Sequence, residues 1–172
     1  MLAYAAGDNA AFEILYGRHR GGLYRFIARG LSPRSQADDC FQDTWSRVIQ
    51  ARGRYRVESK FSTWLYQIAQ RLMIDQYRRQ RPQVSLDDED APMPLSEPEQ
   101  ARPDQHLSRF EEARSLQLAL AELPDEQRIV LQLRLEQELT LETIGEITGV
   151  GRETVKSRLR YAMDKLRASL RP

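Results

Sequence analysis

Residues 139–166 read LTLETIGEITGVGRETVKSRLRYAMDKL, and this stretch determines the fold that we expect for the second half of the chain. Thr140 can cap a short helix, and Gly149 marks the point where that helix should stop. A longer basic helix should then run from about Arg152 to Leu170. This order of elements is the sequence outline of a helix-turn-helix. Gly145 lies where the two helices of such a motif pack closely, so a small residue is expected there.

The outward face of the last helix carries side chains that can contact DNA. Arg and Lys can reach guanine edges or phosphates, while Glu and Ser can pair with other base edges. A basic helix face is often only solvated, so this prediction depends on the whole cap, turn and helix pattern. The candidate residues lie opposite the apolar stripe of the helix and are Arg152, Glu153, Thr154, Lys156, Ser157 and Arg160.

The first half of the chain is expected to be a bundle of helices. Apolar residues recur at helical spacing after a cap at Asp8 or Asn9, up to a break at Gly30. Ser35 can cap a second helix, and a third should begin at Phe61. No stretch alternates as a strand would, so the sequence predicts an all-α protein.

An acidic, proline-rich stretch separates the two helical parts. The net charge is +7 over residues 1–81, −9 over residues 82–126 and +3 over residues 127–172. Residues 82–103 hold five of the eight prolines, which favours an extended linker. We therefore expect two small helical domains, at residues 1–81 and 104–172, and the basic ends of the chain suggest that both domains bind a polyanion.

Composition excludes several classes of protein. Among 172 residues Cys40 is the single cysteine and His19 and His106 are the only histidines, so neither an internal disulfide nor a zinc site of the usual ligand set is expected. Apolar runs fall far short of the ~20 residues that cross a bilayer. No secretion signal follows Met1. We expect a cytoplasmic protein with no metal, no cofactor and no membrane insertion of its own.

One acidic cluster has two possible explanations. Asp38, Asp39, Asp43 and Asp75 could be imagined as a metal site. However, Asp38 and Asp39 should lie in the first turn after Ser35, where the helix dipole favours carboxylates without a metal. We interpret the edge formed by Asp39, Gln42, Asp43 and Arg47 as a polar protein-binding face, and Cys40 as an inert buried thiol.

A loop before the third helix mixes cationic and aromatic side chains. It holds Arg52, Arg54, Tyr55, Arg56 and Lys60 and precedes Phe61 and Trp64. A cationic groove with stacking aromatics is how single-stranded bases are held. The ring bodies of Phe61 and Trp64 can equally belong to the core, which leaves the loop as the better candidate for an unstacked base.

These residues resemble a known family, the extracytoplasmic-function (ECF) sigma factors of bacterial RNA polymerase. Residues 11–81 resemble region two: ADDCFQDTWSRVIQ (37–50) is similar to its polymerase-binding helix, and FSTWLYQIAQRLMIDQYRRQRP (61–82) to the helix that melts and reads the −10 element. Residues 116–170 resemble region four, which reads the −35 element. The two matches come in the family's order and cover roughly three quarters of the chain.

The resemblance implies three sets of contacts. The residues that border core RNA polymerase would be Asp39, Gln42, Asp43, Trp45 and Arg47. Those near the −10 strand would be Arg54, Tyr55, Arg56, Lys60, Trp64, Gln67, Gln70, Arg71 and Arg78. The outward face of the last helix would enter the −35 major groove. Arg71 stands where many relatives have Asn, which bears on the −10 preference.

The expected function is therefore that of a promoter-specificity subunit, not an enzyme. It would bind core RNA polymerase and promoter DNA, help to open the DNA, and be held by a cognate anti-sigma factor. A 22-residue linker spans at most about 70–80 Å, enough for promoter elements about 60 Å apart. Two alternatives stay open: a stand-alone helix-turn-helix regulator that binds a palindrome without polymerase, and a nuclease that needs a divalent metal.

Overall fold

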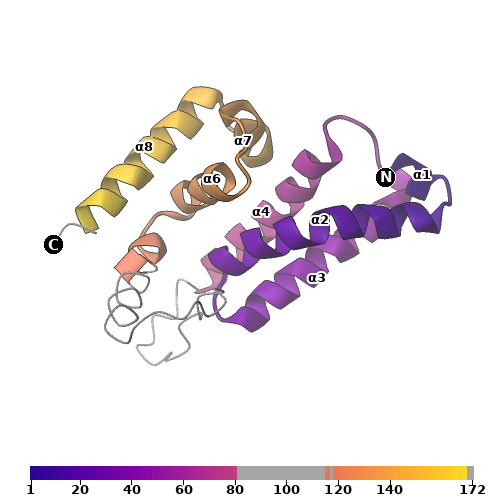
Figure 1. The fold of residues 1–172 in the computed structure, drawn as a ribbon, viewed down its shortest axis with the longest axis horizontal. Helices are drawn as coiled ribbons and strands as arrows, with labels where there is room; N and C mark the ends of the chain where they lie inside the picture. Colours follow the sequence, from indigo (N-terminus) through magenta and orange to yellow (C-terminus); the bar gives the residue numbers. More distant parts are fainter. Residues whose placement is uncertain (81–114, 117, 170–172) are drawn as a thin grey trace, which may run out of the picture.

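The computed structural model describes residues 1–80, 115–116 and 118–169, and every regular element within them is a helix (Figure 1). The all-α prediction is confirmed. The predicted linker, residues 82–103, and the start of the second domain at residue 104 lie outside the described residues. The helices of the first half are α1 (Leu2–Ala5), α2 (Asn9–Gly30), α3 (Arg34–Gln50), the 3₁₀ turn η1 (Arg52–Arg54) and α4 (Phe61–Gln80). Those of the second half are α6 (Asp125–Glu136), α7 (Leu141–Thr148) and α8 (Arg152–Ser169).

The helix starts in the first half are partly as predicted. Asp8 caps α2 by accepting a hydrogen bond from the backbone N–H of Ala11 at 3.2 Å, which decides between the two candidate caps. The prediction that Ser35 caps α3 is wrong, because Pro33 stands at the cap and the helix begins at Arg34. Proline supplies no side-chain acceptor, and Ser35 falls inside the first turn.

This earlier start also corrects the explanation of the acidic cluster. No acidic residue lies in the first turn of α3, so the helix dipole does not account for Asp38 and Asp39. Asp38 is instead held by a neighbouring helix, because the hydroxyl of Tyr24 on α2 donates a 2.8 Å hydrogen bond to its Oδ1.

The helix-turn-helix forms as predicted. The Thr140 hydroxyl accepts from the N–H of Thr143 at 3.2 Å and so caps α7. Gly149 ends that helix at φ 71°, a left-handed conformation that favours glycine. Gly145 explains the tight turn, because a Cβ there would stand 2.7 Å from the carbonyl oxygen of Val150.

The two halves share a single hydrophobic core. Phe26 of α2 and Leu65 of α4 belong to the same buried cluster as Ile129 of α6 and Ile144 of α7. In Figure 1, α6 and α7 lie beside α2 and α4, in agreement with the residue contacts between these pairs. A smaller cluster, which includes Leu131 of α6, joins α6 to α8. The sequence analysis treated the halves as separate modules and did not predict this packing.

Candidate nucleic-acid interface

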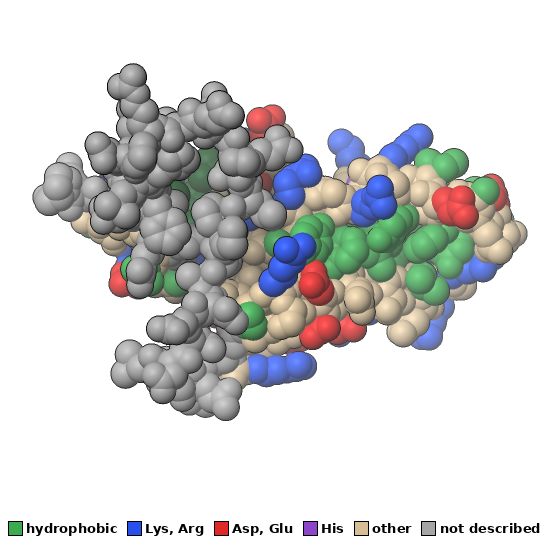
Figure 2. Space-filling view, turned by 60° about the horizontal axis from the view of Figure 1, so that its bottom comes forward, with side chains coloured by type: hydrophobic (Ala, Val, Ile, Leu, Met, Phe, Trp, Pro, Cys, Tyr) green, Lys and Arg blue, Asp and Glu red, His purple; other side chains and the backbone are tan. Residues whose placement is uncertain are grey.

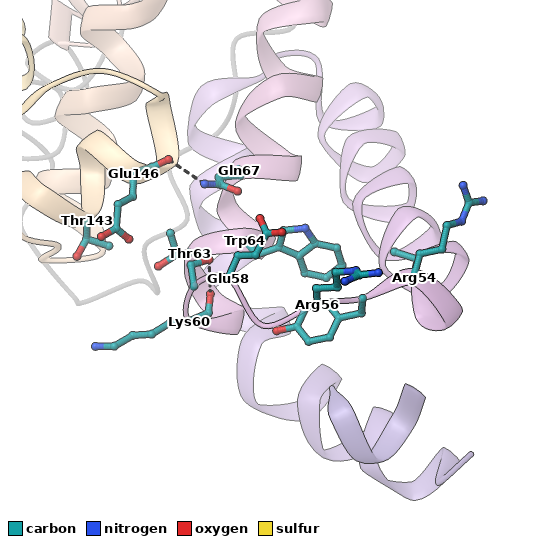
Figure 3. A pocket seen from close by; sticks show the side chains of 12 residues that line it. Arg54, Arg56, Glu58, Lys60, Thr63, Trp64, Gln67, Thr143 and Glu146 are labelled. Carbon is teal, nitrogen blue, oxygen red and sulfur yellow. Dashed lines mark hydrogen bonds between the residues drawn. The ribbon is translucent and has the colours of Figure 1, made fainter. Parts of the chain in front are cut away.

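A cavity of about 890 Å³ opens at the start of α4 (Figure 3). This volume lies within the range of sites that hold small organic groups. The walls include six of the residues predicted to contact the −10 strand, which the structure thus brings together: Arg54, Tyr55, Arg56, Lys60, Trp64 and Gln67. The far wall comes from α7 through Thr143 and Glu146, which the sequence analysis did not include in this site.

Two aromatic rings, those of Tyr55 and Trp64, line this cavity. The Tyr55 ring meets the Trp64 indole edge-to-face with centroids 5.0 Å apart, and Phe61 lies 5.9 Å from the same indole. Trp64 and Phe61 are half-buried and pack against the core, while Trp64 and the half-buried Tyr55 line the cavity. Burial raises the pKa of Tyr55, so its hydroxyl stays protonated at neutral pH and available as a hydrogen-bond donor.

Charge around the cavity is mostly positive on the side of the first half. Arg54, Arg56 and Lys60 are exposed on the loop, with Glu58 among them, while Glu146 adds a carboxylate from α7. Three cations on a short loop attract a phosphate backbone without reading its sequence.

The predicted −10 residues along α4 lie in two different environments. Arg71 and Arg78 are exposed. In contrast, Gln70 is only 7% exposed, and Gln67 donates a 2.8 Å hydrogen bond from Nε2 to the backbone carbonyl of Glu146 on α7. The polar side of α4 that should face a DNA strand is therefore partly covered by the second half of the chain.

One face of α3 presents the residues predicted to contact polymerase. Asp39, Gln42, Asp43 and Arg47 are exposed, and their spacing places them along the same side of the helix. Trp45 differs from them because it is 5% exposed. Within the described part of the chain, no three His, Cys, Asp or Glu side chains are grouped as metal ligands would be.

Aromatic side chains continue this surface across to α2. The Trp45 indole lies 4.9 Å from the ring of Tyr16 and 5.8 Å from that of Phe12. Tyr16, Phe12 and Phe41 are half-buried above it. Figure 2 shows a band of hydrophobic side chains on the half of the molecule built from α2 and α3. Trp45 was predicted to border polymerase, whereas Phe12, Tyr16 and Phe41 were not selected, because helical spacing alone does not show which ring keeps an exposed edge.

The outward face of α8 is accessible, with Arg152, Glu153, Thr154, Lys156 and Arg160 exposed and Ser157 half-buried. Arg152 is engaged by carboxylates, with its Nε 2.6 Å from Glu142 on α7 and its Nη1 3.4 Å from Glu153. The Arg160 guanidinium lies 5.0 Å from the ring centre of Tyr161, an exposed aromatic residue that the sequence analysis did not select. Lys156 and Arg160 are the cations of this face with the fewest competing contacts.

Comparison with known proteins agrees with this arrangement. Residues 15–83 match the family model described as Sigma-70 region 2, and residues 119–168 match Sigma-70, region 4. The chain is 32% identical over 171 residues to the ECF RNA polymerase sigma factor SigW of Bacillus subtilis (strain 168), covering 96% of this chain and 91% of SigW. It is 34% identical over 162 residues to the ECF RNA polymerase sigma factor RpoE of Cereibacter sphaeroides (strain ATCC 17023), covering 93% and 86% of the two chains.

Solved structures show the same fold at lower identity. CnrH, solved in complex with the cytosolic domain of CnrY, aligns with a TM-score of 0.71 at 24% identity over 96% of this chain and 91% of that one. The sigma factor RpoE of Bartonella quintana, solved with the anti-sigma factor NepR, aligns with a TM-score of 0.72 at 21% identity over 93% and 96%. The two family models, the helix order and the full-length relatives lead to one conclusion: the chain belongs to the ECF sigma factors, which act in transcription initiation.

Proposed function

We propose that three surfaces of this chain carry out the sigma-factor role. The exposed face of α3 binds bacterial core RNA polymerase, the cavity at the start of α4 holds an unstacked base of the −10 element, and the outward face of α8 enters the −35 major groove. The protein acts in the cytoplasm as a binding factor without catalysis of its own. Residues 1–81 form the polymerase-binding and −10 domain, residues 82–103 the linker and residues 104–172 the −35 domain.

The cavity is the single observation that carries this proposal. Six residues selected from the sequence surround one space that is large enough for a nucleobase. Cations on the loop would hold the backbone, while Trp64 and Tyr55 offer aromatic surface for a base. Each base captured in this way contributes about 1–3 kcal/mol, so binding energy can drive local strand opening.

The face of α3 supports the polymerase contact in a different way. Asp39, Asp43 and Arg47 form a polar edge beside the half-buried rings of Tyr16 and Phe41. An apolar centre with a charged rim is the usual anatomy of a protein–protein interface. The structural relatives solved with CnrY and NepR support an anti-sigma factor as a further partner of this chain.

Co-elution with bacterial core RNA polymerase on size exclusion tests the proposal. The variant Asp43→Arg with Arg47→Glu reverses two charges on the α3 face and should abolish co-elution. The control is Glu13→Arg with Arg18→Glu on α2, two exposed residues whose exchange makes the same charge changes elsewhere. Failure of the unmodified, folded chain to co-elute would leave a stand-alone DNA-binding regulator as the better explanation.

Promoter opening tests the cavity separately from polymerase binding. Trp64→Ala should leave co-elution intact but reduce the permanganate reactivity of promoter thymines, because it removes the stacking surface. Opening that is unchanged in this variant would exclude Trp64 from base capture.

A further inference from the structure

One cation of the loop before α4 does not belong to the cavity. Arg54, Arg56 and Lys60 line the cavity, whereas Arg52, at the start of η1, is not among the residues of its wall. Arg52 is half-buried, and a charged group that loses part of its hydration needs a compensating partner. The proposed function does not use this residue, so its burial needs a separate explanation.

The partner of Arg52 is an aromatic ring of α1. The guanidinium carbon of Arg52 lies 4.5 Å from the centre of the Tyr4 ring, within the distance of a cation–π contact. Tyr4 is only 7% exposed, so the contact is partly shielded from water, and such shielding strengthens it. Figure 1 shows α1 at the same end of the molecule as the loop that leads into α4.

The position of α1 is itself set by packing on the first half of the chain. The Tyr4 ring lies 5.0 Å from that of Phe12 on α2, and Phe12 in turn meets the buried indole of Trp45 edge-to-face. Gly7 joins α1 to α2 at φ 114°, a conformation that L side chains rarely adopt. These contacts make α1 a fixed support on which Arg52 rests.

The loop has few other attachments to the body of the molecule. Within the part of the chain that the structure describes, the hydrogen bonds of residues 51–60 run only to one another and to the adjoining ends of α3 and α4. At one end of the loop Arg52 lies over the Tyr4 ring. Further along it, Tyr55 lies against Trp64. Three residues of a 3₁₀ turn span only about 6 Å, so a displacement of Arg52 also moves Tyr55.

We propose that Tyr4 and Arg52 form a positioning pair for base capture. The Tyr4 ring on α1 holds Arg52, and Arg52 holds the loop so that Tyr55 stays against Trp64 beside the cavity. Neither member of the pair touches the base. This inference rests on the proposed function, because it concerns the cavity assigned there to an unstacked base of the −10 element.

NMR of the free, full-length chain tests the pair without polymerase or DNA. The indole N–H signal of Trp64, assigned with the variant Trp64→Phe, reports the position of the Tyr55 ring beside it. Arg52→Met keeps an unbranched stem but removes the charge, and Tyr4→Leu keeps an apolar side chain but removes the ring. Both variants should shift the Trp64 signal, whereas Tyr4→Phe keeps the ring and should leave it in place.

A matched control removes the same charge from another cation–π contact. The guanidinium of Arg20 on α2 lies over the Tyr16 ring, and Arg20 is not part of the cavity wall. Arg20→Met should therefore leave the Trp64 signal unchanged. Arg52→Met removes no buried ring, so it keeps the test valid if Tyr4→Leu misfolds.

Promoter opening with core polymerase supplies the functional readout. At a saturating concentration of the chain, Arg52→Met and Tyr4→Leu should each lower the permanganate reactivity of promoter thymines by about fivefold, the effect of losing one partly shielded cation–π contact. The double variant should lose no more than either single variant, because both substitutions remove the same contact. Tyr4→Phe should open the promoter as the unmodified chain does.

Three results would overturn the inference. An unmoved Trp64 signal in Arg52→Met would show that the loop does not depend on the pair. Reduced opening in Arg52→Met but not in a folded Tyr4→Leu would make Arg52 a direct phosphate contact. Normal opening in both variants, while Trp64→Ala impairs it, would show that the position of the loop does not matter. Normal opening in Trp64→Ala would instead refute the base-capturing cavity of the proposed function, while the NMR signal would still decide whether the pair holds the loop.

Discussion

Gly145 lies in α7 at the point where the turn of the helix-turn-helix passes closest to the helix. A Cβ at this position would stand 2.7 Å from the carbonyl oxygen of Val150, well inside ordinary van der Waals contact. The obstacle is backbone rather than a flexible side chain. The same segment is fixed by hydrogen bonds from the N–H groups of Gly149 and Val150 to the Gly145 carbonyl, at 2.8 and 3.1 Å. Gly145→Ala must therefore displace the turn and, with it, the start of α8.

The size of the effect follows from opposing contributions. Overpacking of this kind costs about 1–3 kcal/mol, and weakening one of the turn hydrogen bonds adds about 1 kcal/mol. Replacing a helical glycine by alanine returns about 0.5–1 kcal/mol. We expect Gly145→Ala to lower the free energy of unfolding by about 1–3 kcal/mol and to weaken duplex binding through α8.

Guanidinium unfolding followed by circular dichroism measures this change. Gly17→Ala is the matched control, because Gly17 lies inside α2 and a Cβ there would meet nothing within 4 Å. That variant should be more stable than the unmodified chain by about 0.5–1 kcal/mol. If Gly145→Ala were as stable as Gly17→Ala, the proposed steric limit on the turn would be wrong.

Three smaller predictions concern single side chains. Burial raises the pKa of the Cys40 thiol to about 12, and the charge of Asp43 adds to the effect. A disulfide reagent at pH 8 should therefore label the folded chain hundreds of times more slowly than the chain unfolded in guanidinium. Rapid labelling of the folded chain would contradict the burial of Cys40. Burial, and then the charge of Arg18, lowers the pKa of His19 below 6.5, so the folded state disfavours the protonated ring. The stability contributed by His19 is full above about pH 6.5 and is lost as the pH falls below it, so unfolding midpoints at pH 7.5 and 5.5 should differ less in His19→Gln; an equal difference would exclude His19. Glu138 adopts φ 50° just after α6, where Glu138→Gly should stabilise the fold by about 0.5–1 kcal/mol, and a lower unfolding midpoint would count against backbone strain.

The helices and their ends were predictable where a local signal decides them. Asp8, Thr140 and Gly149 act within their own turn of chain, so their roles can be inferred from a few neighbouring residues. Ser35 misled the prediction because Pro33, two residues earlier, already occupies the cap position of α3. The predicted cap was two residues too late, and this error placed Asp38 in the first turn of the helix, beside the helix dipole. Its actual partner is the hydroxyl of Tyr24, fourteen positions earlier in the sequence.

The candidate site was predictable in its membership but not in its accessibility. Loop cations and the aromatic residues beside them are adjacent in sequence, so their grouping follows from the chain itself. Whether Gln67 faces solvent depends on α7, because its hydrogen-bond partner Glu146 lies seventy-nine residues further along the chain. The spacing of apolar residues within α4 does not indicate which helix will pack against it.

The sequence analysis did not select two residues that join the halves of the molecule, Glu136 and Gln137. Glu136 and Gln137 end α6 and have the composition of an ordinary solvated helix terminus, yet they hold α2 and α4 through Arg29, Gly22 and Tyr66. A surface that must bind DNA has to keep polar groups exposed, and the same polar groups can bind another part of the chain when DNA is absent. The polar character of α4 therefore suits either a contact with DNA or a contact with α7, and at Gln67 the two exclude each other because they use the same side chain.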